Sequence, residues 1–388
     1  MLSIMLLRIP SKDFMKSLIV AYSEMNGNGG GIFATLAYVN AMAALADETV
    51  FMFPSRDDAP DPRIHPAVRQ IPVRDPASRF GKAVRVFFKG IPHRFESQFT
   101  ELVSQERFDL VSFHNSKASR GLIDQAHACG AKVITVHNNY ERDYTVDNEK
   151  WYRLPLTLPA TLKSERESVR KSDLNLVLCE KDRELLYRHY DPRRRSRMEV
   201  LGVFEYAHRE FPVREEVAAP VFVITGNLST RQAEESLVPW MKRYHPLLRE
   251  VVPDAKVIMA GKRPGPGLKA LAAERGIEVV DTPPDMEAVL ARGKYYVCPT
   301  CKGGGVKLRV MDGLRAGLPV LAHDISARGY EPFLDVTLFK YHDRTSFCAS
   351  LERMLSRHPD VRDALHTYSD HFSFEAGRAR LGELLKTI

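Results

Sequence analysis

The chain has 388 residues, of which 44% are apolar and 27% are charged. This length exceeds what one hydrophobic core usually serves, and the composition excludes a disordered or fibrous protein, so we expect two folded domains with a cleft between them. The formal charge of +7 is concentrated in two basic windows, 80–94 and 188–197, and the rest of the chain is almost neutral.

Residues 1–14 are interpreted as an extension of little structural weight. Their apolar start is too short to span a bilayer and has no charged n-region, so neither a transmembrane helix nor a secretory signal is expected. The five cysteines are odd in number and lack the spacing of a disulfide framework, which indicates a reducing compartment. We therefore expect a cytoplasmic protein without disulfides.

Short β-rich apolar runs alternate with helical stretches along the chain, which is the pattern of parallel sheets covered by helices. In the first half, strands are predicted at 18–22, 49–53, 110–113, 132–136 and 174–178. In the second half, they are predicted at 221–225, 256–260, 278–280, 295–298 and 319–322. Between predicted elements, residues 57–76 are expected to form a long loop, and 201–220 a linker between two domains.

The first glycine-rich loop, at 26–31, follows the first predicted strand and precedes a helical run. Gly29, Gly30 and Gly31 let the backbone approach a ligand closely, and amide groups at a helix N-terminus favour a phosphate or another anion. The dinucleotide fingerprint is not met, because Ile32 stands where a small residue is needed. A flexible turn is the alternative interpretation.

The two basic windows admit three interpretations: a solvated surface, a nucleic-acid site or contact with an anionic membrane. Residues 80–89 form an amphipathic pattern in which Lys82, Arg85 and Lys89 cluster away from an aromatic and aliphatic face. The second window adds Arg193, Arg194 and Arg195. A membrane or acceptor surface is favoured over nucleic acid, because no nucleic-acid recognition motif occurs.

The second glycine-rich loop lies between a strand and a helix predicted at 306–316, which Gly317 and Pro319 would end. The helix would point its N-terminal amides at the loop, and two lysines flank it, so the sequence predicts an anion site. The candidate residues are Lys302, Gly303, Gly304, Gly305, Val306 and Lys307. The carboxylate of Asp312 could accept hydrogen bonds from vicinal hydroxyls, or be a solvated helix residue.

Cys298 and Cys301 form a Cys-x-x-Cys pair, which raises redox and zinc hypotheses. Zinc would need a second pair, whereas the other cysteines are scattered singly. A thioredoxin-like motif would lie near the start of its domain, whereas this one lies late in the chain. We therefore expect no metal site.

The residues from Gly303 to Val320, Gly-Gly-Gly-Val-Lys-Leu-Arg-Val-Met-Asp-Gly-Leu-Arg-Ala-Gly-Leu-Pro-Val, resemble the nucleotide-sugar signature of GT-B glycosyltransferases, and of the retaining family 4 in particular. The resemblance extends in order and spacing over nearly the whole chain. Its other segments are the strand ending in a histidine at 133–137, the strand and glycine turn at 221–227, the strand and glycines at 257–266, the base-binding loop at 277–285 and the closing helix from 372.

The resemblance implies an α/β fold of the GT-B type, with two Rossmann-like domains facing each other across a cleft. The N-terminal domain, 1–205, is implied to serve the acceptor, and the C-terminal domain, 206–372, to bind the nucleotide-sugar donor. Residues 373–388 are expected to form a helix that crosses back to the N-terminal domain.

The resemblance also implies roles for single residues. Asp312 matches the second acid of the family's Glu-x7-Glu motif and is implied to bind ribose hydroxyls, whereas the first acid falls at Gly304. The basic pair of the family is only partly present in Arg231, so that Lys307 or Lys302 would supply the missing charge. His137 is implied to touch the donor sugar, and a structural histidine is the alternative interpretation. The remaining residues implied to bind the donor are Gly226, Asn227, Asp281, Thr282 and Pro283.

From these features we expect a metal-independent glycosyltransferase that moves a sugar, as a hexosyl group, from a UDP- or GDP-sugar to a glycan or lipid-linked acceptor. UDP-sugar is favoured as the donor, retention as the outcome, and cell-surface polysaccharide or glycoconjugate synthesis as the context. No cofactor and no nucleic acid is expected, and the protein could be peripheral at the inner face of the membrane. The alternatives are a nucleotide-sugar 2-epimerase and a non-catalytic nucleotide-sugar or glycan-binding protein.

Overall fold

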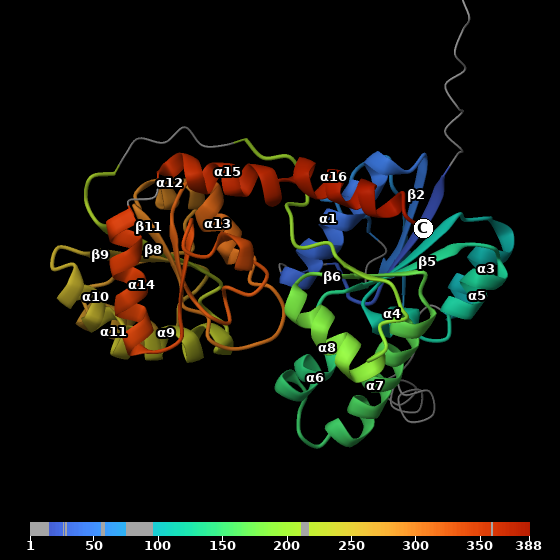
Figure 1. The fold of residues 1–388 in the computed structure, drawn as a ribbon, viewed down its shortest axis with the longest axis horizontal. Coiled ribbons are helices and arrows are strands. Elements are labelled where there is room, and N and C mark those ends of the chain that lie inside the picture. Colours follow the sequence, from blue (N-terminus) through green and yellow to red (C-terminus); the bar gives the residue numbers. More distant parts are fainter. Residues whose placement is uncertain are drawn as a thin grey trace, which may run out of the picture.

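The computed structural model describes residues 15–25, 27, 29–55, 59–74, 96–210, 217–357 and 360–388. These residues form two α/β domains that lie side by side, each with its own parallel sheet (Figure 1). The expected architecture of two Rossmann-like domains, each with a parallel sheet, is confirmed. No helix of the described residues combines the length and the apolar character that crossing a membrane requires.

The N-terminal domain is built on a seven-stranded sheet in the order β3-β2-β1-β4-β5-β6-β7, in which every pair is parallel. Its central strands are continuous apolar runs, because helices cover both faces of the sheet; Leu18, Ile19 and Val20 are fully buried. The strands are β1 (Lys16–Ala21), β2 (Glu48–Pro54), β3 (Arg69–Val73), β4 (Leu110–His114), β5 (Lys132–His137), β6 (Leu174–Val177) and β7 (Met198–Val200).

Helices connect these strands, and the strand order reverses between β1 and β4. In open parallel sheets, ligands bind beyond the carboxyl ends of the strands at such a reversal. The helices are α1 (Gly30–Leu45), α3 (Glu96–Gln105), α4 (Ser116–Ser119), α5 (Ile123–Ala128), α6 (Glu141–Asn148), α7 (Leu154–Lys171) and α8 (Glu180–Tyr190).

The C-terminal domain repeats this arrangement with six parallel strands in the order β10-β9-β8-β11-β12-β13, which reverses between β8 and β11. The strands are β8 (Val221–Gly226), β9 (Lys256–Gly261), β10 (Glu278–Asp281), β11 (Tyr295–Cys298), β12 (Val320–His323) and β13 (Leu338–Tyr341). The helices are α9 (Arg231–Arg243), α10 (His245–Val251), α11 (Pro266–Glu274), α12 (Met286–Ala291), α13 (Arg309–Arg315), the 3-10 turn η1 (Glu331–Phe333), α14 (Arg344–Arg357) and α15 (Val361–His371).

Three strands were not predicted, and all three lie at sheet edges. The expectation of a long loop over 57–76 is wrong at its C-terminal end, where β3 forms. Edge strands are exposed on one side, so they lack the continuous apolar run that marks a central strand. In β3, Pro72 is tolerated because an edge position needs fewer backbone donors.

Helix α13 also differs from the prediction, because it begins at Arg309 and not at residue 306. Gly303 and Gly305 before it have φ angles of 86° and 70°, which a right-handed helix excludes. The expected anion site at the amides of a longer helix is therefore corrected to a turn. Gly317 ends the helix region in the left-handed conformation, as predicted, with φ of 67°.

Two chain segments, which lie side by side, join the domains. The first runs through 201–206, and the second leads from α15 into α16 (Phe374–Leu385), which packs against α1 and crosses the top of the molecule in Figure 1. The Glu205 amide donates to the Phe372 carbonyl at 2.9 Å, and the Arg380 guanidinium donates to the Leu201 carbonyl at 2.5 Å. Gly377 faces the ring of Phe204 so closely that a Cβ there would overlap it.

Candidate functional site

A cleft of about 810 Å³ lies between the two domains, and both domains line it. Its position beyond the carboxyl ends of β1, β4 and β8 agrees with the sites of parallel α/β sheets. The domains touch across it, because Gly305 lies against the Asn139 side chain and Gly30 faces Leu308. Polar side chains from both domains line the cleft. They include Asn115, Lys117, Asn138, Asn139, Glu141, Glu205, Arg209, Asn227, Lys307, Arg309 and Asp312.

The second glycine-rich loop forms part of the C-terminal wall. Gly303, Gly304 and Val306 line the cleft, as the sequence predicts, whereas Gly305 is buried beside Asn139. The left-handed turn at Gly303 and Gly305 brings the carbonyls of the loop together. The Lys307 ammonium donates to the carbonyls of residues 303, 304 and 305 at 3.0, 2.6 and 3.3 Å.

Lys307 therefore places a positive charge at the base of the loop, as the sequence predicts. Burial lowers its pKa to about 8, so the cationic form still predominates at neutral pH. The three hydrogens of the ammonium are used by the carbonyls of the loop, so Lys307 contributes its positive charge to the cleft that its side chain lines, and an anion would compete with the loop for its hydrogen bonds.

Arg309 is a second cation of this wall and was not among the predicted site residues. It lines the cleft, and its guanidinium lies over Gly226 in the place where any larger side chain would project. Arg309 could have been identified by its spacing, because it stands two residues after Lys307 and closely follows the glycines. Asn227, next to Gly226, also lines the cleft.

Asp312 lies one turn along α13 and lines the cleft. Its side chain is 41% exposed, but the exposed part faces a cleft crowded by protein atoms, and this desolvation raises its pKa to about 6. The nearest cation is Arg315, at 3.6 Å, which also contacts Glu287 and, at 3.7 Å, Glu205. The carboxylate is thus held in place and keeps one side toward the cleft.

The N-terminal wall begins at the first glycine-rich loop. Gly29, Gly30 and Gly31 line the cleft, as predicted, and α1 starts without any side-chain cap. The first amides of a helix lack intrahelical acceptors, so those of α1 are available to an anion in the cleft.

A polar cluster that was not predicted completes this wall. Glu141 is almost fully buried and accepts from the Asn115 amide at 2.9 Å, from the Asn139 amide at 3.3 Å and from the Lys117 ammonium at 3.0 Å. These residues follow β4 and β5, where parallel strands bring their carboxyl ends together. Single asparagines carry little signal in a sequence, and only the sheet brings them to one place.

His137 is placed differently from the expectation. It is fully buried at the end of β5, does not line the cleft, and its Nε2 hydrogen-bonds to the Asn175 Oδ1 at 2.9 Å. Burial lowers its pKa to about 4, so the ring is neutral. The geometry does not support contact with a donor sugar, because the side chain turns into the core while Asn138 and Asn139 reach the cleft.

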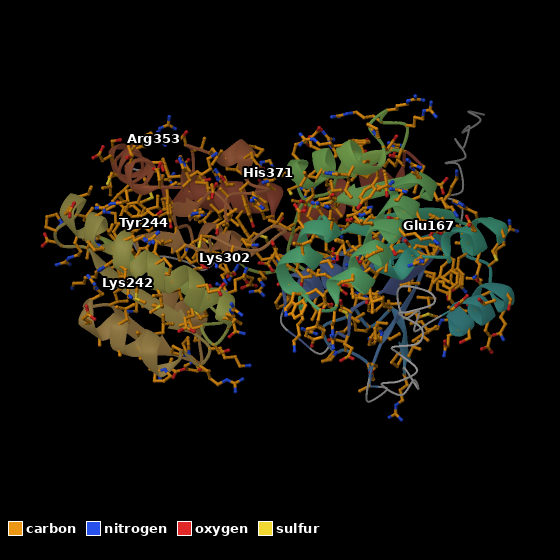
Figure 2. All side chains as sticks on the ribbon, turned by 90° about the horizontal axis from the view of Figure 1, so that it is seen from below. Glu167, Lys242, Tyr244, Lys302, Arg353 and His371 are labelled. Atoms are coloured by element: carbon orange, nitrogen blue, oxygen red, sulfur yellow. The ribbon has the colours of Figure 1, made fainter. Side chains whose placement is uncertain are left out.

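Arg231 and Lys302 also lie outside the cleft lining. The Arg231 side chain is 91% exposed and pairs with Glu235 at 2.8 Å, and Lys302 pairs with the same carboxylate at 3.2 Å. Lys302 lies on the side of the C-terminal domain that faces the N-terminal domain (Figure 2). The cations that the structure brings into the cleft from this domain are instead Lys307 and Arg309.

Asp281 ends the edge strand β10, Thr282 and Pro283 follow it, and none of the three lines the cleft. Asp281 pairs with Lys269 at 2.7 Å, and Thr282 has a left-handed φ of 49°. A role in holding a nucleotide base stays a prediction.

Of the basic surface residues, Lys82, Arg85 and Lys89 lie outside the described residues. Arg193, Arg194 and Arg195 are exposed in the turn after α8 and do not line the cleft. Arg194 pairs with Glu184 at 2.5 Å and lies 4.8 Å from the ring centroid of Tyr187. Their contact with a membrane or an acceptor stays a prediction.

The five cysteines are free, and burial raises the pKa of Cys298. Cys298 lies in the hydrophobic core at the end of β11. Packing therefore accounts for a cysteine at this position. In the part of the chain that the structure describes, no group of three or more His, Cys, Asp or Glu side chains is placed to hold a metal ion.

Comparison with known proteins is informative for both domains. Residues 219–357 match the family model "Glycosyl transferases group 1". A search of curated proteins finds no match. The resemblance seen in the sequence is confirmed by the family model and by the fold of solved structures.

Among solved structures, sucrose-phosphate synthase from Thermosynechococcus elongatus is 12% identical, with a TM-score of 0.70 over 96% of this chain and 98% of that one. Anabaena HepE in complex with UDP is 11% identical, with a TM-score of 0.63 over 96% and 100%. WaaG, a glycosyltransferase involved in lipopolysaccharide biosynthesis, is 14% identical, with a TM-score of 0.62 over 95% and 99%. At these identities, the likeness establishes the fold of the whole chain.

Proposed function

We propose that this chain, whose C-terminal domain belongs to the group 1 glycosyltransferases, transfers a hexosyl group from a nucleoside diphosphate sugar to an acceptor hydroxyl with retention of configuration. The observation that carries the proposal is the convergence of two cations, Lys307 and Arg309, with the glycine loop and Asp312 on one wall of the cleft. Cations and a carboxylate in this arrangement match the diphosphate and the ribose of one ligand.

The donor would lie along the C-terminal wall. Lys307 and Arg309 would bind the diphosphate, with the amides at Gly30 and Gly31 facing it from the other domain. Asp312 would accept hydrogen bonds from the ribose hydroxyls. The hexose would then lie toward the amides of Asn138 and Asn139 on the N-terminal wall, where neutral donors and acceptors suit its hydroxyls.

In the transfer step, the bond between the anomeric carbon and the diphosphate oxygen breaks, and negative charge develops on the diphosphate. Fixed cations aimed at that charge lower the barrier, which is the role we give to Lys307 and Arg309. The acceptor hydroxyl oxygen forms the new bond on the face that the diphosphate leaves, and its proton passes to the diphosphate. No side chain forms a covalent bond in this step.

Retention is supported by the state of the acids in the cleft. Three acids line it within the described residues: Glu141 pairs with Lys117, Glu205 with Arg209 and Asp312 with Arg315. Attack from the opposite face needs a free base on the acceptor side. The carboxylates of Glu141 and Glu205 are occupied by their cations, and Asp312, whose pKa is raised, lies on the donor wall and not on the acceptor side, so attack on the leaving face is favoured.

UDP is the donor nucleotide that we favour, because the HepE neighbours carry UDP or UDP-glucose. WaaG and the galactosyltransferase WaaB, both of lipopolysaccharide biosynthesis, support a glycan or lipid-linked acceptor in cell-surface polysaccharide synthesis. The free cysteines fit a cytoplasmic protein, and the exposed arginines after α8 fit contact with the inner face of an anionic membrane.

A thermal-shift screen of UDP- and GDP-sugars tests the proposal, followed by an assay of nucleotide release with and without acceptors. We expect stabilisation by at least one UDP-sugar and slow nucleotide release without acceptor. Interconversion of the UDP-sugar without acceptor would instead show the epimerase. Tight binding without turnover on any acceptor would show a binding protein, and no stabilisation by any nucleotide would reject the donor site.

A further inference from the structure

The large apolar side chains that face solvent are gathered on one feature of the N-terminal domain. Of the six exposed large apolar residues in the described part of the chain, five lie between residues 144 and 156, and Val336 is the sixth. Trp151 is the extreme case, with 82% of its surface exposed. We call this cluster the aromatic rim; its members are Tyr144, Val146, Trp151, Tyr152 and Leu156.

The aromatic rim lies on α6, on the turn after it and on the start of α7, at the lower end of the N-terminal domain in Figure 1. Folding does not account for it, because tryptophan is highly buried on average and monomers rarely gather exposed apolar residues into one patch. The second tryptophan of the chain, Trp240, is 1% exposed in the core of the C-terminal domain. The rim therefore indicates a binding surface.

The rim is continuous with the cleft. Tyr144 and Asn148 line the cleft and stand four residues apart on α6, so they share one face of the helix. The Asn148 amide donates to the Tyr144 carbonyl at 2.9 Å, which holds the amide at the end of α6. Trp151 and Tyr152 follow three and four residues later, with ring centroids 6.0 Å apart at an angle of 88°. The side chains that line the cleft at the end of α6 are thus followed, a few residues along the chain, by two exposed rings.

The net charge of the segment that carries the rim indicates which class of partner it could bind. Residues 141–153 contain four acids and three bases, so the segment carries no positive excess. Arg142 pairs with Asp143 at 2.8 Å, and Arg153 lies 3.8 Å from Glu149. Nucleic acids and anionic bilayers are recognised by clusters of free cations, which this segment lacks. A neutral partner with both apolar faces and hydroxyl groups fits it better.

We propose that the aromatic rim holds a neutral oligosaccharide acceptor whose growing end enters the cleft past Asn148 and Tyr144. This deepens the proposed function by naming the acceptor class, and it rests on that function. The C–H faces of successive sugar rings pack on Trp151 and Tyr144, which offer large, stiff contact surfaces at a small loss of side-chain entropy. Tyr152 supports Trp151 edge to face, and its own ring carries Lys150 and Arg153 at 5.9 and 5.8 Å from the centroid. The Asn148 amide and the acids of α6 bind hydroxyls between the rings.

The positions of the two tryptophans provide the first test. Because Trp240 is buried and Trp151 exposed, a ligand on the rim changes the emission of Trp151 alone. We would titrate the protein with maltoheptaose, cellohexaose and chitohexaose, with glucose, and with vesicles of phosphatidylcholine alone or mixed with phosphatidylglycerol. We expect a blue shift with at least one oligosaccharide and no shift with glucose or vesicles. A shift with vesicles alone, or with none of the oligosaccharides, overturns the proposal.

Calorimetry on variants gives the second test. With the oligosaccharide that shifts the emission, Trp151→Ala should weaken binding about tenfold, as expected for truncation of a central aromatic contact. Trp151→Phe should retain most of the affinity, and Val336→Ala, an exposed apolar residue of the other domain, should not change it. Equal affinity in Trp151→Ala and the wild type overturns the proposal.

UDP binding separates this proposal from the donor site. Trp151→Ala should bind UDP with wild-type affinity, because the rim lies beyond the part of the cleft that Lys307 and Asp312 line. Oligosaccharide binding by a protein that binds no nucleotide would reject the proposed function while leaving the rim a glycan site. UDP binding by a protein that binds no oligosaccharide would overturn the proposal for the rim and leave the proposed function standing.

Discussion

At the scale of single residues, Asp312 shows how the cleft prepares a carboxylate. Arg315 holds it from one side, and burial in the cleft raises its pKa while leaving an oxygen free to accept hydrogen bonds. A carboxylate in this state is stabilised most by a ligand whose hydroxyl groups donate hydrogen bonds to it. A ribose offers two such donors, and this is why we give Asp312 the ribose and not the diphosphate.

Asp312→Ala should leave the fold intact and weaken the binding of UDP and GDP about 10- to 100-fold, because hydrogen bonds to an ionised group are lost. Calorimetry measures the affinity, and circular dichroism checks the fold. The exposed Asp343→Ala, outside the cleft, serves as the matched control. An unchanged affinity would remove Asp312 from the donor site.

The pKa values of Asp312 and Lys307 predict how donor binding depends on pH. The raised pKa of about 6 means that Asp312 loses its charge as the pH falls through 6, and the lowered pKa of about 8 means that Lys307 loses its charge above 8. Affinity for UDP-glucose should therefore be greatest between these values and decline on both sides.

Calorimetry across this pH range would show which residue causes each decline. Asp312→Asn should flatten the acid side of the profile, and Lys307→Met should flatten the alkaline side. If both variants keep the shape of the wild-type profile, other groups control the pH dependence, and the assigned roles of the two residues are wrong.

At the scale of elements, the end of β8 and the start of α13 act together. Gly226 ends β8 and leaves the space that the guanidinium of Arg309 occupies. An alanine at this position would displace the guanidinium, because a flexible side chain moves more easily than the backbone. Because Gly226 has no side chain, the guanidinium of Arg309 can lie at the end of β8.

Gly226→Ala should therefore lower transfer activity by displacing Arg309, and it should also lower stability, because a φ of 155° is a conformation that residues with a side chain rarely adopt. Activity in Arg309→Ala should fall to a similar extent, and the double variant should be no worse than either single one, because both changes remove the same interaction. Gly267→Ala in α11, where a Cβ meets no atom within 4 Å, is the matched control. Additive losses in the double variant would contradict this coupling.

The elements also show which predictions the sequence permits. The central strands were predicted because burial on both faces demands apolar runs, and the glycine loops because few residues tolerate their backbone angles. The edge strand β10 was predicted, whereas the edge strands β3, β7 and β13 and the true start of α13 were missed, because exposed edges and turns carry mixed residues. His137 and Arg231 follow the family pattern, yet one side chain turns into the core and the other into solvent.

At the scale of the whole molecule, the two segments at 201–206 and 372–374 connect the domains, and α16 lies on them. Gly377 allows this packing, because its missing side chain leaves room for the ring of Phe204. The contact joins a helix at the end of the chain to the linker between the domains. It therefore contributes to the stability of the assembled molecule and not of one domain alone.

Gly377→Ala should destabilise the protein by about 1–3 kcal/mol, the usual range for overpacking. Urea unfolding measures the loss, and Gly267→Ala controls for the general effect of replacing a helical glycine. UDP affinity should fall as well, because the ring of Phe204, which the added methyl group would displace, lines the cleft. An unfolding midpoint equal to that of the control would show that α16 shifts to accept the side chain.

The sequence by itself determined the class of fold, the two parallel sheets and the glycine loops, because each depends on local patterns of burial or backbone conformation. It singled out Asp312 through the resemblance to the family motif. Only the tertiary structure decided which side chains meet in the cleft. It selected Arg309 and the cluster around Glu141, and it left Arg231, Lys302 and His137 outside. The physical reason is that a site between two domains depends on the directions of side chains from distant strands, and no local pattern records those directions.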